Sequence, residues 1–200
     1  MIANPKKANI TISGFGKFGN IEHNPTSILV SRIDEGFKRK FNIISAKVLE
    51  VSTVGCEEYL NSLPKDTINL HFGVFNGSKH FRVEQCGYNL KDFGIPDMRG
   101  YEPKNECINN ECEDDKPCNT KINVKELVKI LKKKFNVVVS DDPGRYICNY
   151  MYYCSLKKNC NSLFVHFPSF HTIDEETQYQ FVIKLLETIH ELYSQNILIE

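Results

Sequence analysis

One cysteine in this sequence lies where a nucleophilic thiol could meet a substrate. Cys148 follows the turn-forming segment 140–144 and lies within a helical pattern at 145–157. It is one step away from the apolar stripe of that helix, which consists of Ile147, Tyr150, Met151 and Cys154. A helix N-terminus stabilises a thiolate, and Cys148 gains from this only if the helix begins near Tyr146 rather than at Pro143. The alternative is a small buried side chain, since free cysteine is commonly buried.

A histidine at the end of a later apolar run could act as the base for such a thiol. His166 follows the apolar residues 163–165 and precedes Pro168, so it lies at the exit of an expected strand. From there the imidazole could reach a neighbouring loop. The alternative is a core histidine bonded to the backbone, and spacing does not exclude His71 or His171 as the base.

A carboxylate on another expected strand could orient that histidine. Glu84 shares one face of its strand with His80 and Arg82, because side chains two residues apart point to the same side. The carboxylate could therefore hold an imidazole in place or pair with Arg82. The sequence leaves both interpretations open.

A glycine-rich loop at 14–19 carries two phenylalanines, Phe15 and Phe18. It matches neither the G-x-G-x-x-G dinucleotide fingerprint nor a Walker motif, so it does not favour phosphate binding. The two aromatic rings favour a small apolar pocket instead. Four cysteines between 86 and 118 contain no C-x-x-C pair, so we expect neither a metal nor a cofactor.

Alternating strand and helix patterns must position these residues. Strands are expected at 9–13, 43–51, 68–75, 80–85, 136–139 and 163–167. Helices are expected at 25–40, after the N-cap Asn24, and at 124–135, 145–157 and 175–193, with a short helix or turn at 54–62. This alternation predicts an α/β sandwich in which ligands gather beyond the carboxyl ends of the strands. The turn signal at Asn76 predicts that 68–75 and 80–85 are paired neighbours, which makes the sheet mixed. The β-branched run at 136–139 predicts a strand buried on both faces.

Composition limits the classes of partner. The 200 residues fit one domain, residues 1–200, with an irregular surface excursion at about 86–120. The formal net charge is zero, which argues against a nucleic-acid partner. The sequence has no secretory signal pattern and no apolar stretch of about 20 residues, so we expect no membrane partner and a cytoplasmic protein. In that reducing compartment the eight cysteines are expected to be thiols.

Four short segments stand in a distinctive order along the chain. They are ISGFGKFG at 12–19 with Asn-Pro at 24–25, RVE at 82–84 with Asn89, SDDPGRYICNY at 140–150, and FVHFP at 164–168. These segments resemble pyroglutamyl peptidase I, a family of cysteine peptidases, in order and in spacing from about residue 10 onward. Residues 73–82, Lys17 and the excursion depart from the family pattern.

The resemblance implies a three-layer α/β/α sandwich with a twisted mixed central sheet. It also implies an activity, the hydrolysis of an N-terminal pyroglutamyl residue from peptides through a thioester intermediate. The catalytic residues that it implies are Cys148, His166 and Glu84. The implied substrate-binding residues are Phe15, Phe18 and Ile147.

Two other classes of function remain open from the sequence. A non-catalytic interaction protein could keep this fold and use residues 86–120 as a binding arm. A nucleoside phosphorylase could also be built on a related sandwich, although no phosphate-binding loop is evident. The sequence leaves the oligomeric state and the natural peptides undetermined.

Overall fold

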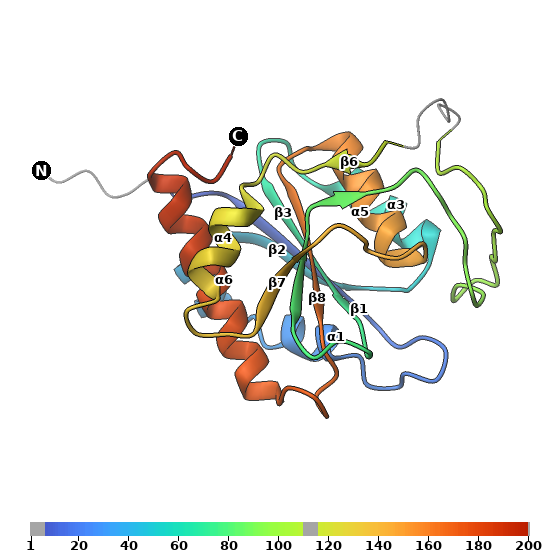
Figure 1. Cartoon of the computed structure of the whole chain (residues 1–200), viewed down its shortest axis with the longest axis horizontal. Helices are drawn as coiled ribbons and strands as arrows, with labels where there is room; N and C mark the ends of the chain where they lie inside the picture. The colour runs from blue at the N-terminus through green and yellow to red at the C-terminus, as the bar shows by residue number, and fades with distance from the viewer. Residues whose placement is uncertain (1–6, 110–115, 200) are drawn as a thin grey trace, which may run out of the picture.

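A six-stranded sheet forms the centre of the molecule, with its strands in the order β2-β1-β3-β8-β4-β7. The computed structural model describes residues 7–109 and 116–199 (Figure 1). The strands of this sheet are β1 (Ile10–Phe15), β2 (Ile43–Leu49), β3 (Ile68–Val74), β4 (Phe81–Glu84), β7 (Val137–Ser140) and β8 (Ser162–Phe167). A separate ribbon pairs β5 (Cys86–Gly87) with β6 (Cys118–Asn119).

Helices cover both faces of the sheet, as Figure 1 shows. One apolar core joins the sheet to α1 (Pro25–Ser31), α2 (Glu35–Phe41), α4 (Val124–Leu131) and α6 (Glu175–Ser194). A second core joins the opposite face to α3 (Thr53–Ser62) and α5 (Ile147–Lys158). Phe72 and Phe181 are fully buried in the first core, and Met151 and Phe164 in the second. The expected α/β/α sandwich with a mixed sheet is confirmed.

Strand β4 makes the sheet mixed, because it is antiparallel to β8 and parallel to β7. All the other neighbouring strands of the sheet are parallel. The expected pairing of 68–75 with 80–85 across the turn at Asn76 is wrong, since β8 lies between β3 and β4. The insertion of β8 brings residues 82 and 84 next to residues 164 and 166.

Two further boundaries differ from the sequence prediction. β7 is the last strand of the sheet rather than one buried on both faces, and its Val139 is 38% exposed. The single helix expected at 25–40 is divided into α1 and α2, because Asp34 caps a new helix by accepting a hydrogen bond from the Phe37 N–H.

Side chains cap the first turns of the helices with one exception. The N-cap residues whose side chains accept a first-turn hydrogen bond are Asn24, Asp34, Ser52, Asn123 and Asp174. The exception is α5, whose N-cap Tyr146 makes no such bond. Within the described ranges, α5 is therefore the one helix whose first-turn N–H groups have no side-chain cap.

The segment 86–120 is more regular than the sequence predicts. Its described part contributes β5 and β6 and packs a fully buried Phe93 against the second core. Asp97 is also buried and accepts hydrogen bonds from the backbone N–H groups of Thr53, Arg99 and Tyr101 at 3.1, 2.9 and 3.0 Å. The segment is thus attached to the start of α3.

The cysteines are not all thiols, so that expectation is wrong for Cys107, which is disulfide-bonded. The free cysteines in the described residues are Cys56, Cys86, Cys118, Cys148, Cys154 and Cys160. Cys112 lies outside the described residues.

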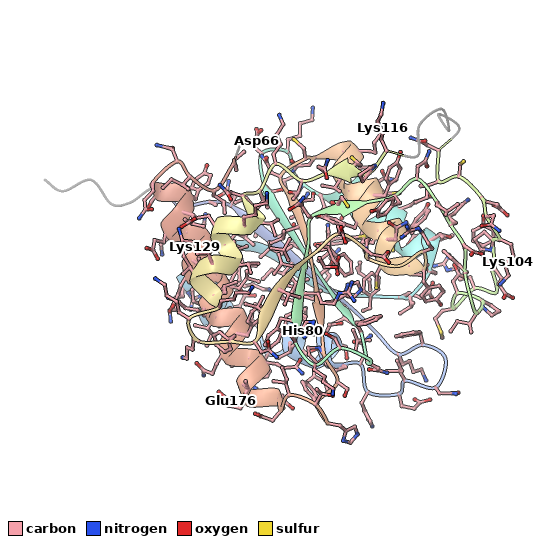
Figure 2. The ribbon with its side chains drawn as sticks, in the orientation of Figure 1. Asp66, His80, Lys104, Lys116, Lys129 and Glu176 are labelled. Carbon is pink, nitrogen blue, oxygen red and sulfur yellow. The ribbon has the colours of Figure 1, made fainter. Side chains whose placement is uncertain are left out.

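No helix within 7–109 and 116–199 has the length and apolar character needed to cross a bilayer. Charged side chains of both signs point outward around the rim of the molecule in Figure 2, among them Asp66, Lys104, Lys129 and Glu176.

Candidate active site

Helix α5 places the thiol of Cys148 in its first turn. The helix begins after Tyr146, so Cys148 is its second residue, and the sequence had left this start ambiguous. The positive end of the helix dipole and the uncapped first-turn N–H groups both favour negative charge at this position. Cys148 is partly exposed, whereas Cys56 and Cys86 are buried. Cys148 is therefore a partly exposed thiol at the N-terminus of a helix.

Strands β4 and β8 bring the second and third candidate residues together. The antiparallel register pairs Arg82 with His166 and Glu84 with Phe164. Oε1 of Glu84 accepts a hydrogen bond from Nδ1 of His166 at 2.8 Å, and both side chains are buried. This bond fixes the orientation of the ring and leaves Nε2 to face the thiol.

Cys148 and His166 interact directly. Burial by itself lowers the pKa of His166, but the charge of Cys148, a hydrogen bond to it, and the bond and charge of Glu84 together raise that pKa to about 9. Nearby negative charge and hydrogen bonds to the charged form both favour a protonated imidazole, so the raised pKa of His166 reflects its contacts with Glu84 and Cys148. The structure thus brings all three sequence-predicted residues, from α5, β4 and β8, into one contiguous group.

Arg82 pairs with the same carboxylate. Its Nε lies 3.4 Å from Oε1 of Glu84, and its Nη2 donates to Oγ of Ser140 at 2.7 Å and to the carbonyl of Asp142 at 2.8 Å. The two interpretations of Glu84 left open by the sequence are both realised. Oε2 of Glu84 is buried and has no hydrogen-bond partner among the described residues, so Oε1 makes the contacts of this carboxylate with both His166 and Arg82.

A glycine in β3 makes room for the thiol. A Cβ added to Gly73 would lie 2.9 Å from Sγ of Cys148 and 2.7 Å from the ring of Phe164. Contacts this short do not occur for real Cβ atoms. The absence of a side chain at Gly73 therefore lets α5 approach the sheet closely enough for Cys148 to meet His166.

An apolar slot opens beside Cys148. Phe15, Phe18 and Ile147, the three predicted substrate-binding residues, all line it. The sequence did not identify its other lining residues, which are Asn24, Val51, Val74 and Tyr146. Val51 and Val74 lie at or just after the carboxyl ends of strands. The rule that ligands gather beyond the carboxyl ends of strands could therefore have identified both residues.

Hydrogen bonds from α1 and β2 hold the glycine-rich loop that carries the two phenylalanines. The Phe15 N–H donates to Oγ1 of Thr26 at 3.0 Å, and the Gly16 N–H donates to the Leu49 carbonyl at 2.8 Å. Nδ2 of Asn24 donates to the Gly16 carbonyl at 3.0 Å. The slot wall is thus rigid at Phe15, which is buried, and looser at Phe18, which is partly exposed.

The two rival histidines lie away from this group. His71 is fully buried, with Nδ1 and Nε2 each 2.8 Å from a serine hydroxyl, of Ser13 and Ser155 respectively. Burial lowers the pKa of His71 to about 3, so it stays neutral in the folded protein. His171 is exposed in the turn that follows β8.

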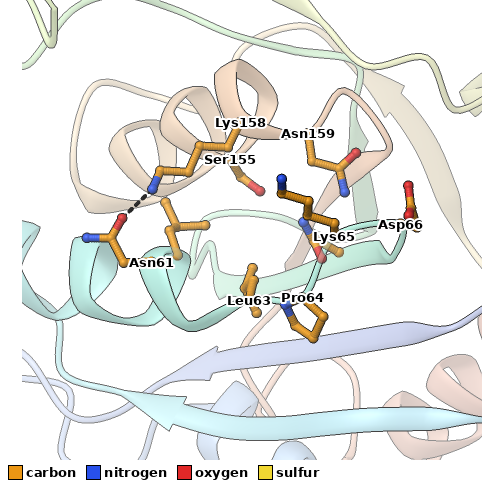
Figure 3. A pocket seen from close by; sticks show the side chains of 10 residues that line it. Asn61, Leu63, Pro64, Lys65, Asp66, Ser155, Lys158 and Asn159 are labelled. Carbon is orange, nitrogen blue, oxygen red and sulfur yellow. Dashed lines mark hydrogen bonds between the residues drawn. The ribbon is translucent and has the colours of Figure 1, made fainter.

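A larger cavity lies at the opposite end of α5 (Figure 3), and none of the predicted site residues line it. It measures about 450 Å³ and lies among Leu63, Lys158 and Asn159. Nζ of Lys158 donates to Oδ1 of Asn61, and Nδ2 of Asn159 donates to the Thr67 carbonyl. Because these polar groups already bond to the protein, we place the candidate site at the much smaller slot beside Cys148, where the reactive groups converge.

No group of three or more His, Cys, Asp or Glu side chains that could hold a metal ion occurs in the described part of the chain. The converging groups are instead a thiol, an imidazole and a carboxylate, next to an apolar slot and a helix N-terminus. This arrangement supports nucleophilic attack by a thiolate on a carbonyl group.

Comparison with known proteins gives one consistent family. The family model described as "Pyroglutamyl peptidase" matches residues 8–175. The pyrrolidone-carboxylate peptidase of Thermosipho africanus is 29% identical over 168 residues, which are 80% of each chain. Human pyroglutamyl-peptidase 1 is 27% identical over 173 residues, covering 82% of this chain and 80% of the human protein.

Solved structures show the same fold. The pyrrolidone carboxyl peptidase of Fervidobacterium islandicum superimposes with a TM-score of 0.79 at 29% identity, covering 92% of this chain and 99% of that one. The pyrrolidone carboxyl peptidase of Thermococcus litoralis superimposes with a TM-score of 0.81 at 21% identity, covering 94% and 96%.

Proposed function

The chain belongs to the pyroglutamyl peptidase family of cysteine peptidases, and on that premise we propose that Cys148, His166 and Glu84 hydrolyse the bond after an N-terminal pyroglutamyl residue. Cys148 is the nucleophile, His166 is its base, and Glu84 orients His166. The observation that carries this assignment is the arrangement of the three groups, in which Glu84 bonds Nδ1 of His166 at 2.8 Å and leaves the other ring nitrogen to the thiol.

In the first half of the reaction the thiol proton moves to Nε2 of His166, and the thiolate attacks the carbonyl carbon of the pyroglutamyl residue. The resulting tetrahedral oxyanion collapses to a thioester as the carbon–nitrogen bond breaks. The imidazolium gives its proton to the departing amine, so the released peptide leaves with a neutral α-amino group. In the second half, His166 takes a proton from a water molecule that attacks the thioester, and the proton then returns to the thiol as pyroglutamate is released.

The start of α5 provides donors for the oxyanion. The N–H groups of Cys148 and its neighbours have no side-chain cap, unlike those of the other helices in the described ranges. Each such donor contributes about 3–4 kcal/mol to transition-state stabilisation in comparable sites. The missing cap at Tyr146 therefore has a chemical role, since a capping side chain would occupy the groups that the oxyanion needs.

The slot suits a lactam ring. A pyroglutamyl residue has no α-ammonium group, and the slot presents Phe15, Phe18 and Ile147 without a charged side chain among its lining residues. Its free volume of about 20 Å³ holds little more than one water molecule. The ring therefore requires an outward movement of the partly exposed walls at Phe18 and Tyr146.

The assay is release of aminomethylcoumarin from pyroglutamyl-aminomethylcoumarin under reducing conditions. Cys148→Ala should lower kcat by at least about 10⁴-fold while keeping the circular dichroism spectrum, because it removes the nucleophile alone. Cys160→Ala is the matched control, since Cys160 is also a free, partly exposed thiol. Turnover by Cys148→Ala at the wild-type rate would refute the assignment, and inactivity of folded wild-type protein would favour a non-catalytic interaction protein.

The proposal also covers the compartment in which the protein acts and the residues that form its active domain. We place it in the cytoplasm, where a catalytic thiol stays reduced, with residues 1–200 acting as one domain on pyroglutamyl peptides and without a nucleic-acid or membrane partner. Under cytoplasmic redox conditions the Cys107 disulfide should open without loss of activity, which mass spectrometry and the coumarin assay can measure together.

A further inference from the structure

One large apolar side chain stands exposed next to the catalytic histidine. Phe75 is 44% exposed and directly follows β3, on the same face of the sheet as Gly73. Its ring centroid lies 5.9 Å from that of His166, with the two planes inclined at 59°. The hydrogen bond from the Phe75 N–H to the Phe167 carbonyl, 2.8 Å long, fixes its backbone to β8. An exposed phenylalanine that is held this firmly beside reactive groups is a candidate contact for substrate.

An arginine supports the ring of Phe75 from another side. The guanidinium carbon of Arg82 lies 4.8 Å from the centroid of the Phe75 ring. Arg82 is itself held by Ser140, Asp142 and Glu84, as described above, and its side chain is 22% exposed. Phe75 is thus fixed between His166 and an immobilised cation, which lowers the entropy cost of using it as a binding surface.

The positions of the slot and of Phe75 define a direction across the site. The slot lies beside Cys148, and neither His166 nor Phe75 lines it. A carbonyl carbon bonded to Sγ of Cys148 therefore lies next to both the slot and His166. The departing amine must lie near His166, because that residue gives it a proton. The side chain on the carbon next to this amine then lies within reach of the exposed ring of Phe75, whose centroid is 5.9 Å from that of His166.

We infer that Phe75, supported by Arg82, forms the surface that receives the residue following the pyroglutamyl group and that it selects large apolar or aromatic side chains there. This inference rests on the proposed function and adds a preference for the departing residue. Stacking on a fixed aromatic ring favours an aromatic side chain over alanine by about tenfold in kcat/KM.

An acidic residue is a poorer match for this surface. Arg82 contacts the ring of Phe75, and its Nη2 already donates to Ser140 and Asp142 while its Nε lies 3.4 Å from Glu84. A substrate carboxylate that paired with Arg82 would compete with these contacts. Arg82 is therefore a positioning residue for Phe75 and Glu84 rather than a carboxylate-binding residue.

The test compares three substrates that differ only in the departing residue: pyroglutamyl-phenylalanine amide, pyroglutamyl-alanine amide and pyroglutamyl-glutamate amide. Product release is followed by chromatography, and kcat/KM is measured for each. Wild-type protein should favour phenylalanine over alanine by about tenfold. Phe75→Ala should reduce this ratio to about one or two, whereas Phe75→Tyr should keep it, because tyrosine retains the ring. Ile44→Ala is the control, since Ile44 is an exposed apolar residue on β2, at the far edge of the sheet.

Several outcomes would overturn the inference while leaving the proposed function intact. They are a wild-type ratio near one, an equal loss for both substrates in Phe75→Ala, and a preference for glutamate over phenylalanine. Absence of hydrolysis of all three substrates by folded wild-type protein would instead overturn the proposed function. The ratio between substrates is the decisive quantity, because a merely structural role of Phe75 lowers both rates together.

Discussion

Replacing the buried carboxylate Glu84 with its neutral isostere should move the basic limb of the pH–rate profile to lower pH. The basic limb reports loss of the proton that Cys148 and His166 share, and the pKa of His166 is raised to about 9. Glu84 contributes to that rise through its hydrogen bond and its charge, against the opposing effect of burial. Glu84→Gln keeps the side-chain volume and removes the charge, so the pKa of His166 must fall.

The size of the shift follows from the geometry. Two unit charges about 4 Å apart interact by about 4 kcal/mol at an effective dielectric constant near 20. Because Nε of Arg82 lies 3.4 Å from the same carboxylate oxygen, part of the attraction is already compensated. Taking about half of it, about 2 kcal/mol, gives roughly 1.5 pKa units at 1.36 kcal/mol per unit. The basic limb of Glu84→Gln should therefore lie at about pH 7.5, because the pKa of His166 starts from about 9.

The assay measures kcat/KM for pyroglutamyl-aminomethylcoumarin across a pH range that includes both the acidic and the basic limb of the profile. A fall in kcat of up to about 10⁴-fold is expected as well, because a neutral amide can hold the wrong tautomer of the imidazole. Glu126→Gln is the matched control, since Glu126 is an α4 carboxylate that pairs with Lys129 in the other helix layer. A basic limb in Glu84→Gln that coincides with the wild-type limb would refute the coupling of Glu84 to His166.

Three further predictions concern residues that shape the site or stabilise the fold. Gly73→Ala should destabilise the protein by about 1–3 kcal/mol and lower kcat by about 100-fold, because its methyl group displaces the Cys148 thiol; wild-type kinetics in a folded variant would contradict this. Asp97→Asn should cost about 1–3 kcal/mol in urea unfolding and raise KM, since it weakens the bond to the Thr53 N–H beside the slot; an unchanged midpoint and KM would count against it. The free energy of unfolding should fall as the pH drops from about 6.5 toward 3, because His71 stays neutral when folded and takes up a proton when unfolded. Urea unfolding of His71→Asn should show a shallower pH dependence, and an equal slope would assign the acid sensitivity to other groups.

Local chemistry explains why the sequence predicted so many of the elements. The helix and strand patterns depend on neighbouring residues, and the N-caps at Asn24 and Asp174 act over three residues. Residues 140–150 combine the start of a helix with Cys148, and residues 163–167 combine a strand with His166. Each segment could therefore be recognised by itself, without knowledge of its partners in the fold. Phe15 and Phe18 were selected in the same way, from a loop of six residues.

Pairing between distant segments explains the errors in the predicted strand order. The turn signal at Asn76 predicted a hairpin, but β8 is inserted between β3 and β4 and pairs with both. No local pattern carries that information, because β8 lies about 80 or more residues further along the chain than its partners in β3 and β4. The same limit explains why β7 was wrongly expected to be buried on both faces, since its β-branched residues suit either an edge or an interior position.

The sequence by itself predicted the α/β class and most of the elements, and its family resemblance implied Cys148, His166 and Glu84 as reactive groups and Phe15 and Phe18 as slot residues. Only the tertiary structure decided that Glu84 bonds His166 rather than Arg82 alone, that His71 is bonded to serines in the core, and that Phe75 stands exposed beside the reacting groups. The physical reason is that a residue type fixes what a side chain can do, whereas its distance to a partner depends on strand order and on how closely α5 packs against the sheet at Gly73.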